Sequence, residues 1–218
     1  MKPRIKICCI ANVEESRKAI AWGASAIGLV GKMPSGPGVI ADAMIQSIAR
    51  STPPAIGTFL LTSETTADDI VNHHRIAQTN TIQMVDTLVE GTYEFLRKYL
   101  PAIKLVQVIH VINEHSLDQA LEVEPHVDAI LLDSGNPNLE IKELGGTGRV
   151  HNWKLSRKIR ESVKVPVFLA GGLSPSNVRQ AIEEVQPFGL DVCSGVRTTG
   201  VLDEKKLEQF MEAALRSV

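Results

Sequence analysis

Residues 165–185 read VPVFLAGGLSPSNVRQAIEEV and contain an apolar run, a glycine-bearing turn and an amphipathic segment, in that order. The run Val165–Ala170 has the composition of a strand that is buried on both faces, as strands of parallel sheets are. Pro175–Val185 has the pattern of a helix with one apolar face. This stretch therefore predicts one strand–turn–helix unit.

The same unit recurs along the whole chain, mostly with strand-to-strand spacings in the twenties. The apolar runs are Ile5–Ile10, Ala26–Gly31, Ala55–Leu61, Thr81–Val85, Leu105–Val111, Ala129–Asp133, Val165–Ala170 and Leu190–Cys193. The amphipathic segments are Glu14–Trp22, Ala41–Ala49, Tyr93–Tyr99, Ser116–Val123, Asn152–Arg160, Pro175–Val185 and Glu204–Leu215, the last with Asp203 as its expected cap.

Eight βα units without a linker predict an α/β fold, a single-domain (β/α)8 TIM barrel over residues 1–218. The alternative is an open doubly wound sheet, which seldom holds eight regular units in so few residues. The longest spacing, from Asp133 to Val165, contains an additional glycine-rich loop.

Composition excludes several classes of protein. The 218 residues hold 23 Lys+Arg and 25 Asp+Glu, so the net charge of −2 gives no basic excess for nucleic acid. No apolar run approaches the roughly 18 residues of a membrane span, and the N-terminus lacks the features of a signal peptide. Three cysteines without metal-type spacing favour a reducing cytoplasm.

The first strand ends in Lys6-Ile7-Cys8-Cys9-Ile10. Alternation along a strand places Lys6 and Cys8 on one face and Cys9 on the other, so one cysteine is expected to face the barrel mouth. A cysteine there acts as a nucleophile or as a general base, whereas the alternative is a cysteine buried in the core.

The sixth strand ends in Asp133 after four apolar residues. Burying a carboxyl group without a partner is costly, and apolar surroundings raise its pKa, which suits a general acid. The alternative is an aspartate that caps the following loop.

Glycines cluster after the last three predicted strands, in Gly145-Gly146-Thr147-Gly148, Gly171-Gly172 and Ser194-Gly195. Glycine lets backbone N–H groups approach an oxyanion, and barrels frequently bind phosphate after strands seven and eight. These loops predict a phosphate site. The six histidines show no metal-binding pattern, only His110 is placed to reach the mouth, and no metal or organic cofactor is implied.

Together these tracts resemble the phosphoribosylanthranilate isomerase family of tryptophan biosynthesis. The resemblance runs from Lys6-Ile7-Cys8 to the last helix. It is most specific in Gly145–Trp153, Leu169–Val178 and Asp191–Val196.

The resemblance implies a cofactor-independent Amadori rearrangement of a phosphorylated small molecule by a monomer or homodimer. It assigns Cys8 as the general base and Asp133 as the general acid, and places Asp191 near the substrate amine. The substrate-binding residues that it implies are Gly146, Gly148, Gly171, Gly172, Ser194 and Gly195.

The chain departs from the family pattern at several positions. Pro37 or Gly38 stands where an arginine usually meets the anthranilate carboxylate, and Asp86 follows the fourth strand. Cys9 replaces a usual glycine. Cys193 replaces a usual serine, and Arg197 replaces a common glutamate.

These departures leave two other functions open: a paralogous isomerase of another phosphosugar, and a non-catalytic phosphate-ligand binding protein. For the anthranilate substrate, Arg197 or Lys32 is expected to supply the missing positive charge. A disulfide between Cys8 and Cys193 is a further hypothesis, since strands one and eight adjoin in a closed barrel.

Overall fold

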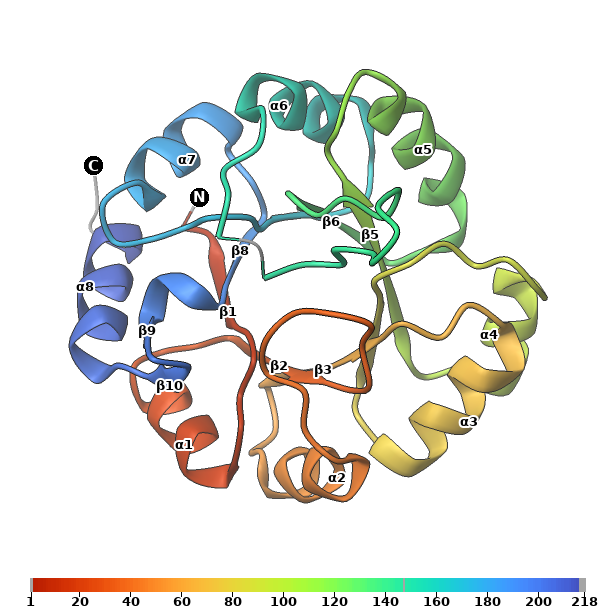
Figure 1. Cartoon of the computed structure of the whole chain (residues 1–218), viewed down its shortest axis with the longest axis horizontal. Helices are drawn as coiled ribbons and strands as arrows, with labels where there is room; N and C mark the ends of the chain where they lie inside the picture. The colour runs from red at the N-terminus through yellow and green to blue at the C-terminus, as the bar shows by residue number, and fades with distance from the viewer. Residues whose placement is uncertain (1, 147, 216–218) are drawn as a thin grey trace.

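The computed structural model describes residues 2–146 and 148–215, and these form a closed barrel of parallel strands in the order β1 to β8. The helices surround the strands as an outer ring (Figure 1). The predicted (β/α)8 barrel is therefore confirmed. Its extent over residues 1–218 stays a prediction, because Met1 and residues 216–218 lie outside the described residues, as does Thr147 of the glycine-rich loop.

The barrel strands are β1 (Arg4–Ile7), β2 (Ala26–Val30), β3 (Gly57–Thr62), β4 (Thr81–Met84), β5 (Lys104–His110), β6 (Ala129–Asp133), β7 (Val167–Leu169) and β8 (Gly189–Val192). The α-helices are α1 (Val13–Ala21), α2 (Asp42–Ser51), α3 (Ala67–Ala77), α4 (Tyr93–Tyr99), α5 (His115–Val123), α6 (Trp153–Ser162), α7 (Val178–Val185) and α8 (Glu204–Leu215). The remaining elements are the 3₁₀ helices η1 (Glu124–His126) and η2 (Ser194–Val196) and the short strands β9 (Arg197–Thr198) and β10 (Val201–Leu202).

The apolar side chains of the barrel form two separate clusters. One cluster fills the space between strands and helices and includes Ile5 and Ile7 of β1. The other fills the barrel interior and includes Phe59, Val106 and Leu131. Because both faces of each strand are buried, the strands appear in the sequence as continuous apolar runs.

Several helices begin where the sequence supplies a polar cap. Asn12 accepts a hydrogen bond from the backbone N–H of Glu15, and Asn152 caps α6 in the same way. Asp203 accepts from the N–H of Lys206 at 3.1 Å, which confirms the predicted cap of α8. Within the described residues, no helix has both the length and the apolar composition needed to cross a bilayer.

Helix α3 was not predicted from the sequence. Its buried face consists of Ala67, Ile70, Val71, His74 and Ala77. His74 occupies a buried position on this face, where its ring N–H donates to the Thr79 carbonyl oxygen at 2.7 Å. A polar residue that is satisfied by a local hydrogen bond therefore weakened the apolar periodicity of this segment.

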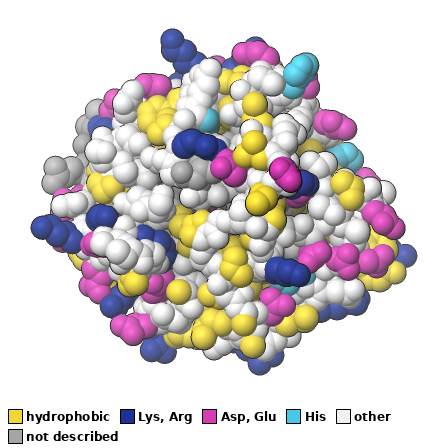
Figure 2. Space-filling model, viewed as in Figure 1, with side chains coloured by type: hydrophobic (Ala, Val, Ile, Leu, Met, Phe, Trp, Pro, Cys, Tyr) yellow, Lys and Arg dark blue, Asp and Glu magenta, His cyan; other side chains and the backbone are white. Residues whose placement is uncertain are grey.

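Two long loops lie across the mouth of the barrel, one after β2 and one after β6 (Figure 1). The Ser35 hydroxyl donates to the backbone oxygen of Lys142 at 2.6 Å and joins them. On this face of the molecule, hydrophobic side chains gather toward the middle, and most charged side chains lie toward the edge (Figure 2). The loops thus cover the ends of the strands that carry the predicted site residues.

Candidate active site

All but one of the predicted site residues come together in one cavity at the carboxyl ends of the strands. Eight of the nine line it: Cys8, Asp133, Gly146, Gly148, Gly171, Gly172, Asp191 and Ser194. Gly195 does not line the cavity. It lies against the backbone of Leu173, so close that a side chain at this position would collide with it.

Cys8 follows β1 and is 5% exposed within the barrel-interior cluster. Burial, together with the nearby Asp191 carboxylate, raises the pKa of the Cys8 thiol to about 11, while the Lys6 ammonium group opposes this rise. At neutral pH Cys8 is therefore a thiol. To act as a base it must first give up its proton.

Both adjacent cysteines line the cavity, so the prediction that only one faces the mouth was wrong. The strand ends at Ile7, and Cys9 has a φ of +62°, which interrupts the alternation of side chains. This left-handed conformation suits glycine, which explains why the family usually has glycine here.

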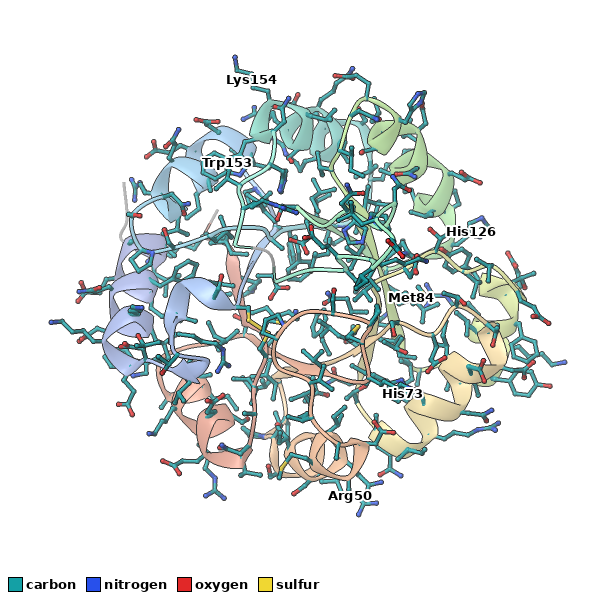
Figure 3. The ribbon with its side chains drawn as sticks, viewed as in Figure 1. Arg50, His73, Met84, His126, Trp153 and Lys154 are labelled. Carbon is teal, nitrogen blue, oxygen red and sulfur yellow. A yellow bond between two sulfur atoms is a disulfide. The ribbon has the colours of Figure 1, made fainter. Side chains whose placement is uncertain are left out.

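A disulfide joins Cys9 to Cys193, with their Cα atoms 5.9 Å apart, beside the middle of the ring (Figure 3). The hypothesis of a bond between Cys8 and Cys193 was therefore wrong: Cys8 is a free, buried thiol. The turned backbone at Cys9 brings its sulfur to Cys193. The disulfide thus links the segment that carries Cys8 to the segment that carries Ser194.

Replacing both bonded cysteines with serine is expected to lower the free energy of unfolding by about 2–4 kcal/mol, since the disulfide restricts the unfolded chain. The link joins residues separated by 184 positions, so the loop that it closes is long. Guanidinium unfolding with and without reductant measures the loss. Reductant should destabilise the original chain and leave the double serine variant unchanged. Equal stability of the two proteins without reductant would contradict the prediction.

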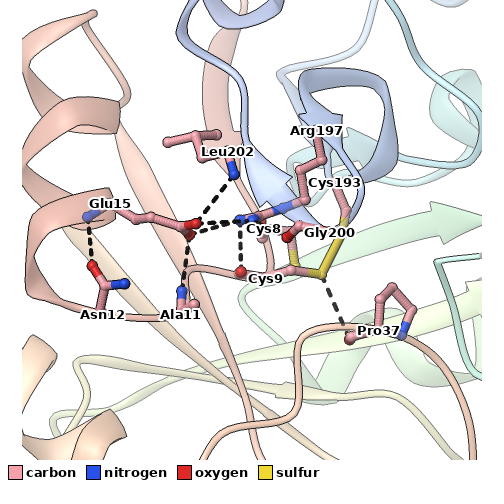
Figure 4. A network of polar contacts seen from close by, with 10 residues as sticks. All are labelled: Cys8, Cys9, Ala11, Asn12, Glu15, Pro37, Cys193, Arg197, Gly200 and Leu202. Carbon is pink, nitrogen blue, oxygen red and sulfur yellow. Dashed lines mark hydrogen bonds and ion pairs between the residues drawn. A yellow bond between two sulfur atoms is a disulfide. The ribbon is translucent and has the colours of Figure 1, made fainter.

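Arg197 does not face the cavity, which makes the expectation that it meets the substrate carboxylate wrong. Its guanidinium group pairs with Glu15 at 3.1 Å and donates to the backbone oxygens of Cys8 and Cys9 (Figure 4). Burial opposes the charge on Glu15, but the hydrogen bonds from Arg197 and from two backbone N–H groups outweigh it and lower the pKa of Glu15. Arg197 therefore fixes the backbone around the cysteines.

Asp133 ends β6 and is 7% exposed. One of its carboxyl oxygens accepts from the N–H of Ser134 at 2.8 Å, as the capping alternative predicts. Burial is the largest influence on its pKa and raises it, and the Asp191 carboxylate adds to this effect. A buried carboxyl group that holds its proton above the ordinary range fits the chemistry of a general acid.

Asp191 on β8 lies beside Lys6 on β1, and the two residues are register partners in neighbouring strands. The Lys6 Nζ lies 2.8 Å from Asp191 Oδ2, whereas Asp191 Oδ1 is buried with no hydrogen-bond partner in the described part of the chain. The sequence interpretation placed Lys6 on the face of Cys8 but gave it no role. The alternation that joins Lys6 to Cys8 was the signal that pointed to it.

The two glycine-bearing loops after β7 and β8 adopt conformations that require glycine. Gly172 has a φ of +63°, and a Cβ atom there would lie 2.6 Å from the backbone of Arg149. The Asn177 side chain holds this loop by donating to the Gly172 oxygen at 2.9 Å and accepting from the Ser174 N–H at 2.8 Å. Among the hydrogen bonds of residues 2–146 and 148–215, none uses the backbone N–H of Gly172 or Ser194.

Asp86 lies outside the cavity lining, because Gln83 and Val85 of the same segment point inward instead. Its carboxylate forms an ion pair with Lys142 of the loop after β6. Asp86 therefore adds no negative charge to the lining of the cavity. Of the two residues that stand where an arginine is expected, Pro37 lines the cavity and Gly38 does not.

Comparison with known proteins agrees with this arrangement. The profile of the N-(5'-phosphoribosyl)anthranilate isomerase family matches residues 5–213. The chain belongs to this family. N-(5'-phosphoribosyl)anthranilate isomerase 2 of Methanosarcina mazei is 37% identical to it over 97% of this chain and 93% of the relative. The isomerase of Methanocella arvoryzae is 33% identical over 88% of both chains.

Solved structures of phosphoribosylanthranilate isomerases share the fold. The enzyme from Thermotoga maritima superposes with a TM-score of 0.80 and 29% identity over 97% of this chain and 98% of its own. Another such isomerase, solved in complex with reduced 1-(o-carboxyphenylamino)-1-deoxyribulose 5-phosphate, gives a TM-score of 0.76 at 28% identity, covering 97% of this chain and 98% of its own. As a member of this family, the chain is an isomerase.

Proposed function

We propose that this isomerase converts N-(5-phosphoribosyl)anthranilate to 1-(2-carboxyphenylamino)-1-deoxyribulose 5-phosphate, a step of tryptophan biosynthesis. The observation that carries the proposal is the meeting of Cys8, Asp133 and Asp191 in one cavity bordered by glycine-bearing loops. The rearrangement needs an acid, a base and a site for phosphate, and these groups supply all three.

Asp133 is proposed as the general acid. Its proton goes to the furanose ring oxygen, the bond from C1 to that oxygen breaks, and the sugar opens to a protonated Schiff base. The raised pKa of Asp133 keeps the acid form available at higher pH than an exposed carboxyl group would allow.

Cys8 is proposed as the general base that removes the proton from C2 of the Schiff base. The electron pair of the C–H bond forms the C1–C2 double bond of an enolamine, and the nitrogen becomes neutral. Protonation at C1 and loss of the hydroxyl proton at C2 then give the ketose. C1 is reduced and C2 is oxidised, so no external oxidant or reductant is needed.

Asp191 and the glycine-bearing loops are proposed to hold the substrate. The unpartnered Oδ1 of Asp191 accepts a hydrogen bond from the substrate amine. Backbone N–H groups of Gly171, Gly172 and Ser194 bind the phosphate, and Gly195 lets the turn after Ser194 pack against Leu173. Gly146 and Gly148 border the site from the loop after β6. Two glycine-bearing loops at adjacent strand ends match the phosphate position that barrels frequently use.

A fluorescence assay of phosphoribosylanthranilate consumption tests the proposal. We expect saturable turnover with kcat/KM of roughly 10⁴ M⁻¹s⁻¹ or more. Absence of turnover, with a bound phosphosugar still detected, would instead support another phosphorylated substrate. Binding of phosphoribosylanthranilate without formation of product would support a non-catalytic binding protein.

The state of assembly and the location of the protein are also proposals. The family includes a dimeric enzyme from Thermotoga maritima that has been solved as monomers, and we propose a monomer or homodimer here, which light scattering would distinguish. We propose a cytoplasmic location, with neither nucleic acid nor membrane as a partner.

A further inference from the structure

Lys6 is a lysine whose side chain is entirely inside the barrel, with 0% of its surface exposed. Lysine is almost never fully buried unless its charge is paired. Its partner is Asp191 on β8, whose Oδ2 lies 2.8 Å from Nζ. The closed barrel makes this pair possible, because β1 and β8 adjoin only when the sheet closes.

The same ammonium group also contacts the proposed base. Nζ lies 3.6 Å from the Sγ atom of Cys8, two residues further along the chain and on the same side. It also lies 5.2 Å from the ring centre of Phe59. Gly28 of β2 leaves space for both groups, since a Cβ atom there would lie 2.6 Å from Cys8 Sγ and 3.0 Å from Lys6 Nζ.

We propose that Lys6 is a positioning residue that stabilises the thiolate of Cys8 and holds Asp191 with its second oxygen free for the substrate amine. This inference rests on the proposed function. One ammonium group links the base to the carboxylate that orients the substrate. Burial opposes the charge of Lys6, but the Asp191 carboxylate, together with Cys8 in its thiolate form, outweighs burial and raises the pKa of Lys6.

The charges around Cys8 act in opposite directions. Lys6, on the same strand, favours the thiolate, whereas Asp191 on β8 disfavours it. Asp133 on β6 and His110 on β5 lie further around the barrel. The charge of His110 acts on Asp133 and lowers the pKa of that carboxyl group. Removing Lys6 and removing Asp191 should therefore change the reactivity of Cys8 in opposite senses, which a purely structural role for Lys6 would not produce.

Alkylation of Cys8 by iodoacetamide, followed across pH in the intact oxidised protein, measures the thiolate directly. Cys9 and Cys193 are joined, so Cys8 is the free thiol, and it lines the cavity where a small reagent can reach it. Lys6→Met is expected to slow alkylation roughly 10- to 1000-fold at a given pH, the range for losing an opposite charge at this distance. Asp191→Asn is expected to accelerate it.

Lys104→Met is the matched control. Lys104 also lies on a barrel strand in an ion pair, with Asp128 at 3.0 Å, but at the amino end of β5 and largely exposed. Its alkylation profile should equal that of the original chain. A Lys6→Met profile that coincides with the control would overturn the proposal.

The double variant Lys6→Met with Asp191→Asn covers the case in which Lys6→Met alone fails to fold. It removes both buried charges, so no unpaired ion remains. Adding Lys6→Met to Asp191→Asn should slow alkylation, and an unchanged rate would again overturn the proposal. Failure of the original chain to consume phosphoribosylanthranilate would contradict the proposed function alone, since alkylation needs no substrate.

Discussion

Cys8→Ala is expected to lower kcat/KM for phosphoribosylanthranilate by about 10²–10⁴-fold, the usual contribution of a placed proton-transfer group. Alanine cannot accept the C2 proton, and no other thiol can replace Cys8, because Cys9 and Cys193 are bonded to each other. The glycine-bearing loops are unchanged, so phosphate binding should survive. Fluorescence progress curves with purified original chain and variant measure the loss.

Circular dichroism and thermal unfolding provide the control for Cys8→Ala. Cys8 is small and lines the cavity, so its replacement by alanine removes one sulfur atom from the cavity wall and the variant should fold. A Cys8→Ser variant keeps the shape but offers a much weaker base, and it should be nearly as impaired as Cys8→Ala. A normal rate in either variant would assign the base to another group.

The eight strands were predictable because burial on both faces leaves a continuous apolar run at each of them. The observed bounds differ from the predicted runs by one to three residues at most ends, for example Arg4–Ile7 against Ile5–Ile10. Such ends depend on where neighbouring strands stop pairing, which is a tertiary property. Helix α3 was missed because the polar residue His74 holds a core position, where its hydrogen bond to the Thr79 carbonyl oxygen satisfies the ring.

The positions of Cys8 and Asp133 were predictable in kind, since chemically unusual residues at barrel strand ends face one mouth. Their roles stay proposals. The partner of Cys193 was not predictable by alternation, because the left-handed turn at Cys9 rotates its side chain into the cavity. The glycine that the family usually has at this position was the available signal.

Arg197 shows a second limit of prediction from sequence. A cation near the barrel mouth can replace a missing arginine only if its side chain points toward the substrate, and the sequence does not show which way the side chain points. Only the fold shows that Glu15, from α1, forms an ion pair with the Arg197 guanidinium group. A buried acid and a buried base far apart in the sequence give no local pattern that would identify them as a pair.

Asp133→Asn is the second variant with a large expected effect, again about 10²–10⁴-fold in kcat. The amide cannot protonate the ring oxygen, so the sugar should not open. In the original chain, activity should fall as pH rises through the pKa of Asp133, which burial places above its ordinary value of 3.8. Rates measured across pH test this assignment: an Asp133→Asn variant that keeps both the rate and its alkaline decline would contradict it.

The same substitution should make the protein more stable at neutral pH, in contrast to its effect on activity. The pKa of Asp133 is raised in the folded state, so the stability linked to its proton is fully present below its unfolded pKa. That stability is lost as pH rises through the pKa of the folded state, because the buried carboxyl group then loses its proton and becomes a buried carboxylate. Asparagine does not titrate, and so the gain of Asp133→Asn over the original chain should grow as pH rises from 3.8 through the raised pKa of the folded state. Thermal unfolding of both proteins across this range measures it. A pH-independent difference would mean that Asp133 ionises as readily in the folded chain as in the unfolded one, and it could not then serve as the acid.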